Sequence, residues 1–444
     1  MDRRLPVVVV GAGPVGLAAA AHLVERGLDP VVLEAGDRVG AAVRQWRHVR
    51  LFSPWAELVD DAAARLLDGT GWDRPDSASY PTGEDWAERC LEPLAKSLGD
   101  RVRLGTRVVG VARRGRDRIV DAGRESEPLT VHTLGIDGIE GRITARAVID
   151  ASGTWGTPNP LGGDGLPAIG EHAAASRISY RVPDLSDELV ASRYRGRHVA
   201  VVGSGHSALT ALVELTGSSP ASSAHVTWVL RRGQVGDAFG GEQADALIAR
   251  GELGRRARAV VESGGRVDVV TGFRTAAVER SGDTVALLSD DGRRLDGLDE
   301  LVVLTGFRPE LSWLSELRLD LDASLQAPVA LAPLIDPNVH SCGSVPPHGA
   351  AELAHPEPGF YLVGMKSYGR APTFLALTGY EQVRSVVAEI AGDHAAAARV
   401  DLELPETGVC RGSGLADEPR RATSERCCSD SDVLRLPEPS LVRH

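Results

Sequence analysis

The N-terminal part of the chain alternates short apolar runs with one amphipathic stretch. Four valines at positions 7–10 lead into the turn GAGPVG, and apolar residues then recur at helical spacing over 15–27. A second apolar run follows at 30–33 and ends at Glu34. Short β-branched runs are typical of parallel strands that are buried on both faces. The pattern predicts a strand, a turn, a helix and a second strand, in that order.

The same pattern returns in the middle of the chain. A run at 198–202 enters the turn GSGHSA, a helix is expected to about residue 215, and a strand is expected at 226–230. That strand ends in two arginines where the first unit has an acid. Strands that alternate with helices indicate an α/β fold with parallel sheets. We therefore expect two Rossmann-like nucleotide-binding domains.

The first turn has the residue types that a bound dinucleotide needs. Gly11 permits the tight turn, Gly13 lets the backbone approach a pyrophosphate, and Gly16 lets helix and strand pack closely. Pro14 lies in the turn between strand and helix, and the helix N-terminus attracts phosphate. Glu34 is placed to accept hydrogen bonds from ribose hydroxyls. These five residues predict a dinucleotide site.

The second turn predicts a different nucleotide. Ala208 takes the place of the third glycine, which this packing position tolerates. A guanidinium at the strand end can hold a 2′-phosphate that a carboxylate would repel, so the arginine pair favours NADPH over NADH. The alternative is a solvated arginine pair in an arginine-rich chain. The predicted contacts are Gly203, Ser204, Gly205, His206, Ser207, Arg231 and Arg232.

Two sites of different character suggest two different dinucleotides. A permanently bound FAD at the first site and a diffusing NADPH at the second is the simplest interpretation, with hydride passing from NADPH to the flavin. The expected domains are an FAD-binding domain in two parts, 1–165 and 310–400, with an NADPH-binding domain at 166–309 inserted between them. Residues 401–444 are expected to form an irregular, flexible tail that contains cysteines.

Composition narrows the function class and the compartment. A net charge of −12 argues against a nucleic-acid or anionic-membrane surface. The only lysines are Lys96 and Lys366, which suggests a GC-rich bacterial genome. An N-terminal secretory signal is the alternative for the first apolar run, but the glycines and proline of the first turn interrupt it. No segment reaches the roughly 20 apolar residues of a membrane span. The five cysteines do not resemble a secreted disulfide framework, so we expect a cytoplasmic protein.

Three further segments carry a resemblance to a known family. Residues 148–153 (VIDASG), 301–309 (LVVLTGFRP) and 360–370 (FYLVGMKSYGR), together with the two glycine turns, resemble the two-dinucleotide-binding-domain flavoproteins. That group includes thioredoxin reductases, flavin-containing monooxygenases and Baeyer–Villiger monooxygenases. The third segment is expected to lead into a flavin-contacting helix from Pro372. The resemblance implies cofactor contacts at Ser152, Gly153, Gly306 and Gly364. Lys366 is one of only two lysines in a chain that otherwise uses arginine, so we expect it to contact the flavin or the pyrophosphate, with a surface-loop lysine as the alternative.

The segment 40–55 (GAAVRQWRHVRLFSPW) looks like the one that covers the flavin in the monooxygenase branch. Its aromatic residues are expected to form a wall of the flavin pocket, although aromatic clusters are also common in ordinary cores. We expect cofactor contacts here from Arg44, Gln45, Trp46 and Ser53.

The chain departs from the disulfide-reductase pattern because it contains no CxxC. A monooxygenase needs no protein nucleophile, since reduced flavin activates oxygen while the protein excludes water. The monooxygenase fingerprint before the second turn is incomplete, because His172 stands two residues after Gly170 instead of four. The sequence therefore favours a monooxygenase with an unusual fingerprint, and it identifies no catalytic residue.

The tail adds a metalloid hypothesis. Cys410, Cys427 and Cys428 lie in a polar stretch, and clustered thiolates suit trivalent arsenic or another thiophilic ion. Vicinal cysteines near the end resemble the delivery pair of mercuric reductases. The tail and the segment GMKSYGRAPTFL look like flavin oxidoreductases found alongside bacterial arsenic-resistance genes. Incidental cysteines and a redox-active disulfide remain as alternatives.

The leading hypothesis is an NADPH-dependent flavin monooxygenase that acts on a small molecule and is linked to arsenic or metalloid detoxification. The alternative is an NADPH-driven thiol or metal(loid) reductase that works through Cys427 and Cys428. A third hypothesis is a metalloid-binding or sensor protein with structural nucleotides. The sequence leaves open whether the protein forms a homodimer.

Overall fold

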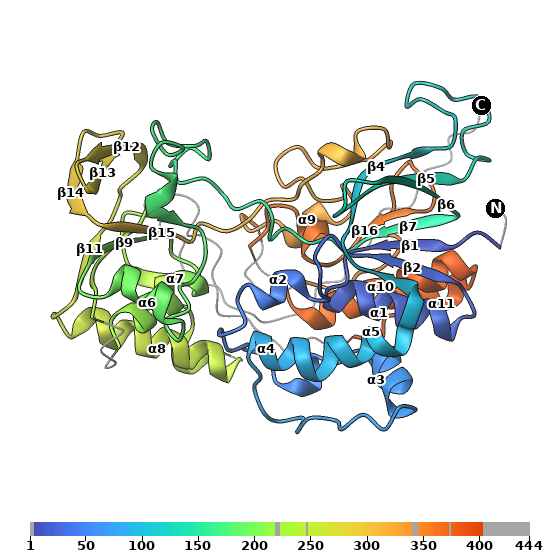
Figure 1. Ribbon diagram of the computed structural model, residues 1–444, viewed down its shortest axis with the longest axis horizontal. Coiled ribbons are helices and arrows are strands. Elements are labelled where there is room, and N and C mark those ends of the chain that lie inside the picture. The colour runs from blue at the N-terminus through green and yellow to red at the C-terminus, as the bar shows by residue number, and fades with distance from the viewer. Residues whose placement is uncertain (1–3, 218–222, 246, 340–344, 373, 403–444) are drawn as a thin grey trace, which may run out of the picture.

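The computed structural model describes residues 4–217, 223–245, 247–339, 345–372 and 374–402 (Figure 1). The chain forms two lobes that extended segments connect. One lobe, coloured blue and orange-red in Figure 1, contains both ends of the described chain. The other lobe, green to yellow, is built from the middle of the sequence. Each lobe is organised around its own parallel sheet.

The sheet of the first lobe has five parallel strands in the order β16-β7-β1-β2-β3. Its central strand β1 is the valine run that opens the sequence, and all four of its residues are buried. The strands are β1 Val7–Val10, β2 Pro30–Leu33, β3 Val102–Arg103, β7 Ala147–Asp150 and β16 Phe360–Leu362. The chain turns to opposite sides of β1 to build β2 and β7, which makes the β1–β7 boundary the switch point where ligands bind in such sheets.

The sheet of the second lobe is also five-stranded and parallel, in the order β11-β10-β9-β15-β8. Its strands are β8 Ile178–Ser179, β9 His198–Val202, β10 His225–Val229, β11 Val267–Val270 and β15 Glu300–Val303. In the sequence, all of these strands lie between β7 and β16 of the first sheet. The predicted insertion of one α/β unit into the other is confirmed, while the exact boundaries at 165, 309 and 400 stay a prediction.

Each lobe also carries a three-stranded antiparallel sheet that the sequence pattern did not predict. These sheets have the orders β4-β5-β6 and β12-β13-β14. Their strands are β4 Thr106–Arg113, β5 Leu129–Gly135, β6 Glu140–Ala145, β12 Thr275–Ser281, β13 Thr284–Ser289 and β14 Arg294–Leu298.

The helices of the first lobe pack mainly around α1, which follows the first glycine turn. They are α1 Pro14–Glu25, α2 Ala41–Arg44, α3 Asp61–Asp68, α4 Gly83–Trp86, the π-helix η2 Ala87–Leu91, α5 Glu92–Leu98, α9 Ala332–Ile335, α10 Ala376–Ala391 and α11 His394–Ala398. The second lobe has α6 Glu188–Tyr194, α7 His206–Leu215 and α8 Ile248–Glu262. Short 3-10 helices are η1 Trp55–Glu57, η3 Gly99–Arg101, η4 Ala175–Arg177, η6 Gly236–Phe239, η7 Glu242–Ala244, η8 Ser312–Leu314 and η9 Gly364–Tyr368.

Two predicted helix bounds need correction. The first helix ends at Glu25 and not at residue 27, because Gly27 adopts a φ of +68° that leaves the helical region. The helix expected from Pro372 begins at Ala376 instead. The backbone N–H of Arg370 donates to the carbonyl of Leu325, at 2.7 Å. That long-range bond fixes the chain just before Pro372, and local sequence patterns do not reveal it.

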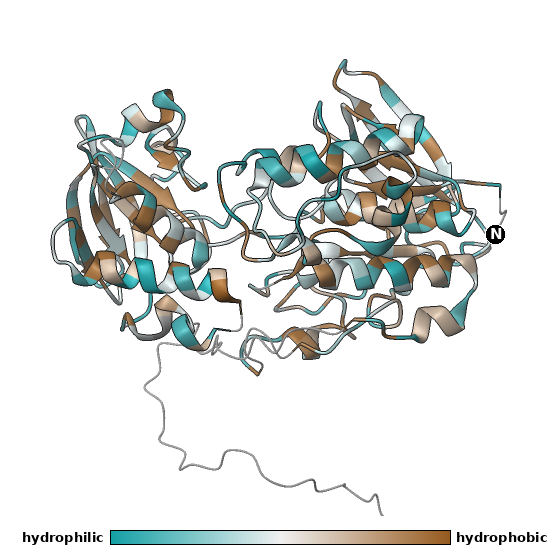
Figure 2. Ribbon diagram, turned by 90° about the horizontal axis from the view of Figure 1, so that it is seen from below, coloured by the Kyte–Doolittle hydropathy of each residue, from teal (hydrophilic) through white to brown (hydrophobic). Residues whose placement is uncertain are grey.

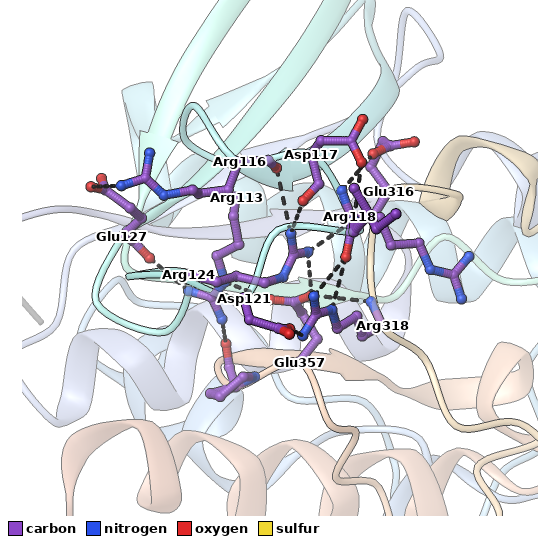
Figure 3. Close-up of polar contacts among 12 residues, drawn as sticks. Arg113, Arg116, Asp117, Arg118, Asp121, Arg124, Glu127, Glu316, Arg318 and Glu357 are labelled. Carbon is purple, nitrogen blue, oxygen red and sulfur yellow. Dashed lines mark hydrogen bonds and ion pairs between the residues drawn. The ribbon is translucent and has the colours of Figure 1, made fainter.

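A buried ionic cluster fastens the returning chain to the antiparallel sheet of the first lobe (Figure 3). Glu357 is almost fully buried, and its two carboxylate oxygens lie 2.5 Å from Arg113 Nε and 2.7 Å from Arg124 Nη2. The backbone N–H of Arg318 also donates to it, at 3.0 Å. Because three donors serve one buried carboxylate, the cluster holds residues far apart in sequence together.

Hydrophobic residues are frequent along the strands of both lobes, and hydrophobic and hydrophilic residues alternate along the helices (Figure 2). Within the described residues, none of the helices combines the length and apolar character needed to cross a membrane.

Candidate functional site

The first glycine turn is built so that only glycine fits at two of its positions. Gly11 has a φ of +99°, and a Cβ there would lie 2.8 Å from the carbonyl oxygen of Ala151. A Cβ on Gly16 would lie 2.0 Å from the carbonyl oxygen of Gly11. A Cβ on Gly13 would meet nothing within 4 Å. The turn is therefore packed closely on the protein side and open in front of Gly13.

The open side of this turn is the N-terminus of α1. Gly13 is the N-cap residue, it has no side chain to cap the helix, and Pro14 occupies the first helical turn. The backbone N–H groups of such a terminus, with the partial positive charge of the helix, suit a phosphate group. This arrangement fits the pyrophosphate of a dinucleotide.

Glu34 lies directly beside the turn. Its carboxylate accepts hydrogen bonds from the backbone N–H groups of Ala12 and Gly36, both at 2.8 Å. These bonds fix the carboxylate at the end of β2, where a ribose would lie. The sequence placed Glu34 there but did not reveal that the turn itself holds the acid.

Most side chains of the segment 40–55 named in the sequence prediction contact other residues of the first lobe. Arg44 pairs with Glu92 at 2.6 Å, and Arg38 shares the same carboxylate oxygen. Trp46 packs over Gly83, where a Cβ would lie 2.8 Å from the indole ring. Trp55 is a core residue of the first lobe, and Ser53 is buried. The cofactor contacts predicted for Arg44, Gln45, Trp46 and Ser53 stay predictions.

Phe52 of the same segment reaches the second lobe. Its ring lies 5.4 Å from the ring of His206, edge to face. Arg47 extends the connection, because its Nε lies 3.3 Å from Asp184 Oδ2. The segment expected to cover the flavin therefore also touches the second glycine turn.

The second turn repeats the geometry of the first. Gly203 has a φ of +130°, and a Cβ there would lie 2.3 Å from the carbonyl oxygen of Leu304. Gly205 caps α7 without a side-chain bond, and a Cβ on it would meet nothing within 4 Å. Ala208 is fully buried at the position of the third glycine. This turn also presents a helix N-terminus to open space.

The two arginines at the end of β10 differ in their surroundings. Arg232 is half-buried, and its Nη2 donates to Ser204 Oγ in the glycine turn at 3.2 Å. Arg231 is exposed, and its Nη1 donates to the carbonyl of Gly163 at 3.2 Å. Arg232 therefore lies beside the turn, where it could pair with a 2′-phosphate, and Arg231 lies at the edge of this nucleotide site.

His206 is the first residue of α7. Burial lowers the pKa of His206 to about 4, and the nearby guanidinium of Arg250 contributes in the same direction. A neutral imidazole in the turn does not repel a nicotinamide and is not poised as a base at neutral pH. The neighbouring Ser207 is exposed. Both residues remain predicted nucleotide contacts.

The loops that follow β7 and β15 meet between the lobes. Trp155 stacks on Phe307 with ring centroids 4.8 Å apart, and its Nε1 donates to Gln45 Oε1 at 3.0 Å. Gly153 and Gly306 have φ values of +69° and +96° in these loops. Sequence reasoning did not single out Trp155, although its place just after the DASG segment was an available signal.

Lys366 is not a surface-loop lysine, which was the alternative for this position. Its side chain is fully buried and lies 2.7 Å from the equally buried Asp150. Its Nζ donates to Ser152 Oγ at 3.1 Å. Gly364, with a φ of +67°, begins the same short helix η9, and its N–H donates to the side chain of Gln382. A direct cofactor contact by Lys366 or Gly364 stays a prediction.

The segment with the incomplete monooxygenase fingerprint contains a buried polar network around Glu171. Glu171 accepts from the N–H groups of Leu161 and Ala168 and from the Tyr180 hydroxyl at 2.5 Å. Burial raises the pKa of Tyr180, and Glu171 raises it further. His172 is exposed and outside this network. The region therefore supports the fold of the second lobe.

The cysteine hypotheses fall largely outside the described residues. Cys410, Cys427 and Cys428 all lie there. Cys90 is the cysteine that the structure describes, and burial raises the pKa of its thiol to about 12. Within the described ranges there is no group of three or more histidine, cysteine, aspartate or glutamate side chains placed to hold a metal ion.

Comparison with known proteins agrees with this geometry. A family model described as pyridine nucleotide-disulphide oxidoreductase matches residues 8–330. A curated ferredoxin–NADP reductase from Ignicoccus hospitalis is 27% identical over 321 residues, which cover 71% of this chain and 81% of that protein.

Solved structures share the fold at lower identity. Bacillithiol disulfide reductase from Bacillus cereus matches with a TM-score of 0.65 and 19% identity, covering 87% of this chain and 99% of that one. The FAD-bound cadaverine monooxygenase from Erwinia amylovora matches with a TM-score of 0.61 and 15% identity, covering 95% and 99%. Reductases and monooxygenases therefore share this architecture.

Proposed function

This chain belongs to the pyridine nucleotide-disulphide oxidoreductase family, and from that premise we propose that it is an NADPH-dependent flavin monooxygenase. The family uses FAD and NAD(P)H, and the chain is an FAD-dependent oxidoreductase. Three points are specific to the proposal: which cofactor each turn binds, the preference for NADPH, and oxygen as the acceptor of electrons.

The first site fits FAD. The open backbone at Gly13 and the N-terminus of α1 would hold the pyrophosphate, and Glu34 would hold a ribose. When bound, FAD supplies a ring that accepts a hydride and passes electrons to an acceptor. The protein's part is to hold that ring and to exclude water. The segment 364–370, which follows β16 beside β7, would complete the site.

The second site fits NADPH. Gly205 and the N-terminus of α7 would face the pyrophosphate, and Arg232 beside Ser204 would pair with the 2′-phosphate. The aromatic stack of Trp155 on Phe307 lies between the loops that follow the two sheets. This stack would orient the reacting ends of the two nucleotides.

The observation that carries the oxygen assignment is the state of the thiols. The sequence contains no CxxC, and Cys90 is buried with a pKa raised to about 12. A thiol in that state is a poor nucleophile and a poor redox partner. Within the part of the chain that the structure describes, Cys90 is the cysteine present and it has no second thiol to pair with, so we infer that electrons leave to oxygen. In each turnover, one NADPH, one proton, one oxygen molecule and one substrate give NADP+, water and the oxygenated substrate.

We extend the proposal to trivalent arsenic as the substrate class. Two features support this extension: the segment GMKSYGRAPTFL, which looks like flavin oxidoreductases found alongside arsenic-resistance genes, and the three tail cysteines Cys410, Cys427 and Cys428. Thiolates favour soft ions of this kind. In this version the tail captures arsenite, and oxygenation converts arsenite to arsenate.

A reductase is the second candidate, because reductases are among the proteins similar to this chain. A ferredoxin–NADP reductase and a bacillithiol disulfide reductase both resemble this chain. In such a reductase, electrons would pass to Cys427 and Cys428 and then to a disulfide or metal(loid) acceptor.

The test measures NADPH oxidation and oxygen uptake together, with and without arsenite. The monooxygenase proposal expects NADPH use and oxygen uptake to be equal, with little hydrogen peroxide once the right substrate is present. Peroxide in full stoichiometry with every substrate would reject oxygenation. A double Cys427→Ser/Cys428→Ser variant that retains FAD but loses turnover under nitrogen would favour the reductase. The absence of NADPH oxidation with any acceptor would reject both in favour of a binding protein.

A further inference from the structure

Lys366 and Asp150 form a charged pair in the interior of the first lobe, at an unusual place in the sheet. Asp150 ends β7 and lies opposite Val10, the last residue of β1, so the pair lies at the switch point between these strands. Both side chains have 0% exposure, and Nζ lies 2.7 Å from Oδ2. Buried ions are costly to desolvate, and a hydrophobic pair would often be at least as stable. Stability alone therefore does not account for charges at this position.

The contacts of the ammonium group determine the direction of one hydrogen bond. An ammonium has three N–H donors and no acceptor. Nζ forms an ion pair with Asp150, donates a hydrogen bond to Ser152 Oγ at 3.1 Å and lies 4.4 Å from the ring centroid of Trp313. Because Lys366 can only donate, Ser152 Oγ must accept. The Ser152 hydroxyl proton is then left to be donated elsewhere.

Ser152 is held at two points by the same pair. Its backbone N–H donates to Asp150 Oδ1 at 3.0 Å, while its hydroxyl oxygen accepts from Lys366. Within the part of the chain that the structure describes, the hydroxyl has no protein acceptor. Ser152 itself is exposed, although the two groups that hold it are buried. The hydroxyl proton is therefore available to an acceptor on the exposed side of the residue.

The first glycine turn lies immediately beside this serine. A Cβ on Gly11 would lie 3.1 Å from Ser152 Cα, and the next residue, Gly153, faces open space. A hydroxyl that donates toward solvent at this position would donate on the side of the turn where the dinucleotide would bind. An oriented hydroxyl suits an anionic or carbonyl oxygen acceptor.

We propose that Lys366 is a positioning residue that acts through Ser152, directing the Ser152 hydroxyl to donate a hydrogen bond to the dinucleotide at the first site. The proposal rests on the assignment of FAD to that site. It replaces a direct contact of Lys366 with a relay in which Asp150 neutralises the lysine and the lysine sets the direction of the serine. Lys366 and Ser152 should then affect FAD binding as one unit.

A double-mutant cycle on the affinity of the full-length apoprotein for FAD tests this unit. Affinity is measured by flavin fluorescence on titration, and circular dichroism verifies that each variant is folded. Ser152→Ala should weaken FAD binding about tenfold, the loss typical of one hydrogen bond to a charged acceptor. Ser152→Thr keeps the hydroxyl and should keep the affinity.

The pair is tested as neutral residues of similar size, Asp150→Asn with Lys366→Met, because either change alone leaves a buried charge without its partner. This double variant should lose the same factor as Ser152→Ala, and the triple variant should lose no more. Lys96→Met, at the other lysine of the chain and exposed on α5, is the matched control and should bind FAD like the parent protein.

Losses that multiply in the triple variant would overturn the relay, because Lys366 would then act independently of Ser152. Unchanged FAD affinity in Ser152→Ala would overturn it as well, and that comparison does not depend on whether the paired variant folds. A parent protein that binds NADPH but no FAD would reject the cofactor assignment itself, which is a different result from either.

Discussion

The selection of NADPH over NADH is predicted to depend on Arg232 much more than on Arg231. Both follow β10, and the sequence offers no reason to rank them. Arg232 is half-buried and bonded to Ser204 in the glycine turn, whereas Arg231 is exposed and bonded to a carbonyl of the connecting segment. The perturbation is therefore Arg232→Ala compared with Arg231→Ala.

The magnitudes follow from these surroundings. A charge-assisted hydrogen bond to a phosphate contributes about 1.5–3 kcal/mol, which corresponds to a loss of roughly tenfold to a hundredfold in apparent NADPH affinity for Arg232→Ala. An exposed ion pair contributes about 0–1 kcal/mol, so Arg231→Ala should cost less than roughly fivefold. Neither change should alter the Michaelis constant for NADH appreciably, because NADH lacks the 2′-phosphate.

The assay is anaerobic reduction of the bound flavin, followed at increasing concentrations of NADPH and of NADH. Arg256→Ala, at an exposed arginine on α8, is a matched control and should leave both constants unchanged. Equal losses for NADPH and NADH in Arg232→Ala would refute the reasoning, since the arginine would then support the turn and not read the phosphate. A larger effect of Arg231→Ala would show that the exposed edge of the site carries the selection.

Four further predictions concern the turns, the buried carboxylate of Glu357 and His206. Gly16→Ala should abolish flavin retention because its Cβ would lie 2.0 Å from a backbone oxygen, whereas Ala208→Gly should keep NADPH binding; flavin content and NADPH titration measure both. Glu357→Gln should destabilise the first lobe by about 3 kcal/mol in urea unfolding, and an unchanged midpoint would contradict the buried cluster. Burial raises the pKa of Glu357, but the hydrogen bonds from the arginines outweigh burial, so the pKa in the folded protein is lowered. The stabilisation by this carboxylate should therefore be present above the ordinary glutamate pKa and should be lost as the pH falls below that value. Because its pKa is lowered to about 4, His206 should stay neutral from about pH 6 to 8, so the pH profile of NADPH affinity should be the same in His206→Gln and in the parent protein; a step near 6.5, the ordinary histidine pKa, that only the parent shows would mean that His206 is protonated there.

The two nucleotide turns were predictable because their determinants are local. Gly11 and Gly203 need positive φ values, and the valine runs before them are buried on both faces whatever surrounds them. The predicted strands at 30–33 and 198–202 agree with the structure to the residue. The resemblance to two-domain flavoproteins drew on the same turns and on the segments that close each sheet.

Other features depended on residues that meet only in the folded chain. Lys366 could be singled out as rare, but its pairing with Asp150 joins positions more than two hundred residues apart. The meeting of Phe52 with His206 and the start of α10 at Ala376 arise in the same way. No local pattern encodes such contacts.

By itself, the sequence determined two α/β units, one inserted in the other, and the acid and the arginines at the ends of their second strands. Backbone sterics and the burial of β-branched strands are short-range effects, so a few adjacent residues suffice to specify them. The tertiary structure alone decided which arginine lies beside the turn, and it placed the rare lysine in the interior with its charge matched by an aspartate. Burial and the choice of partner are set by packing between distant segments, and for charged side chains these two quantities determine what the group can do.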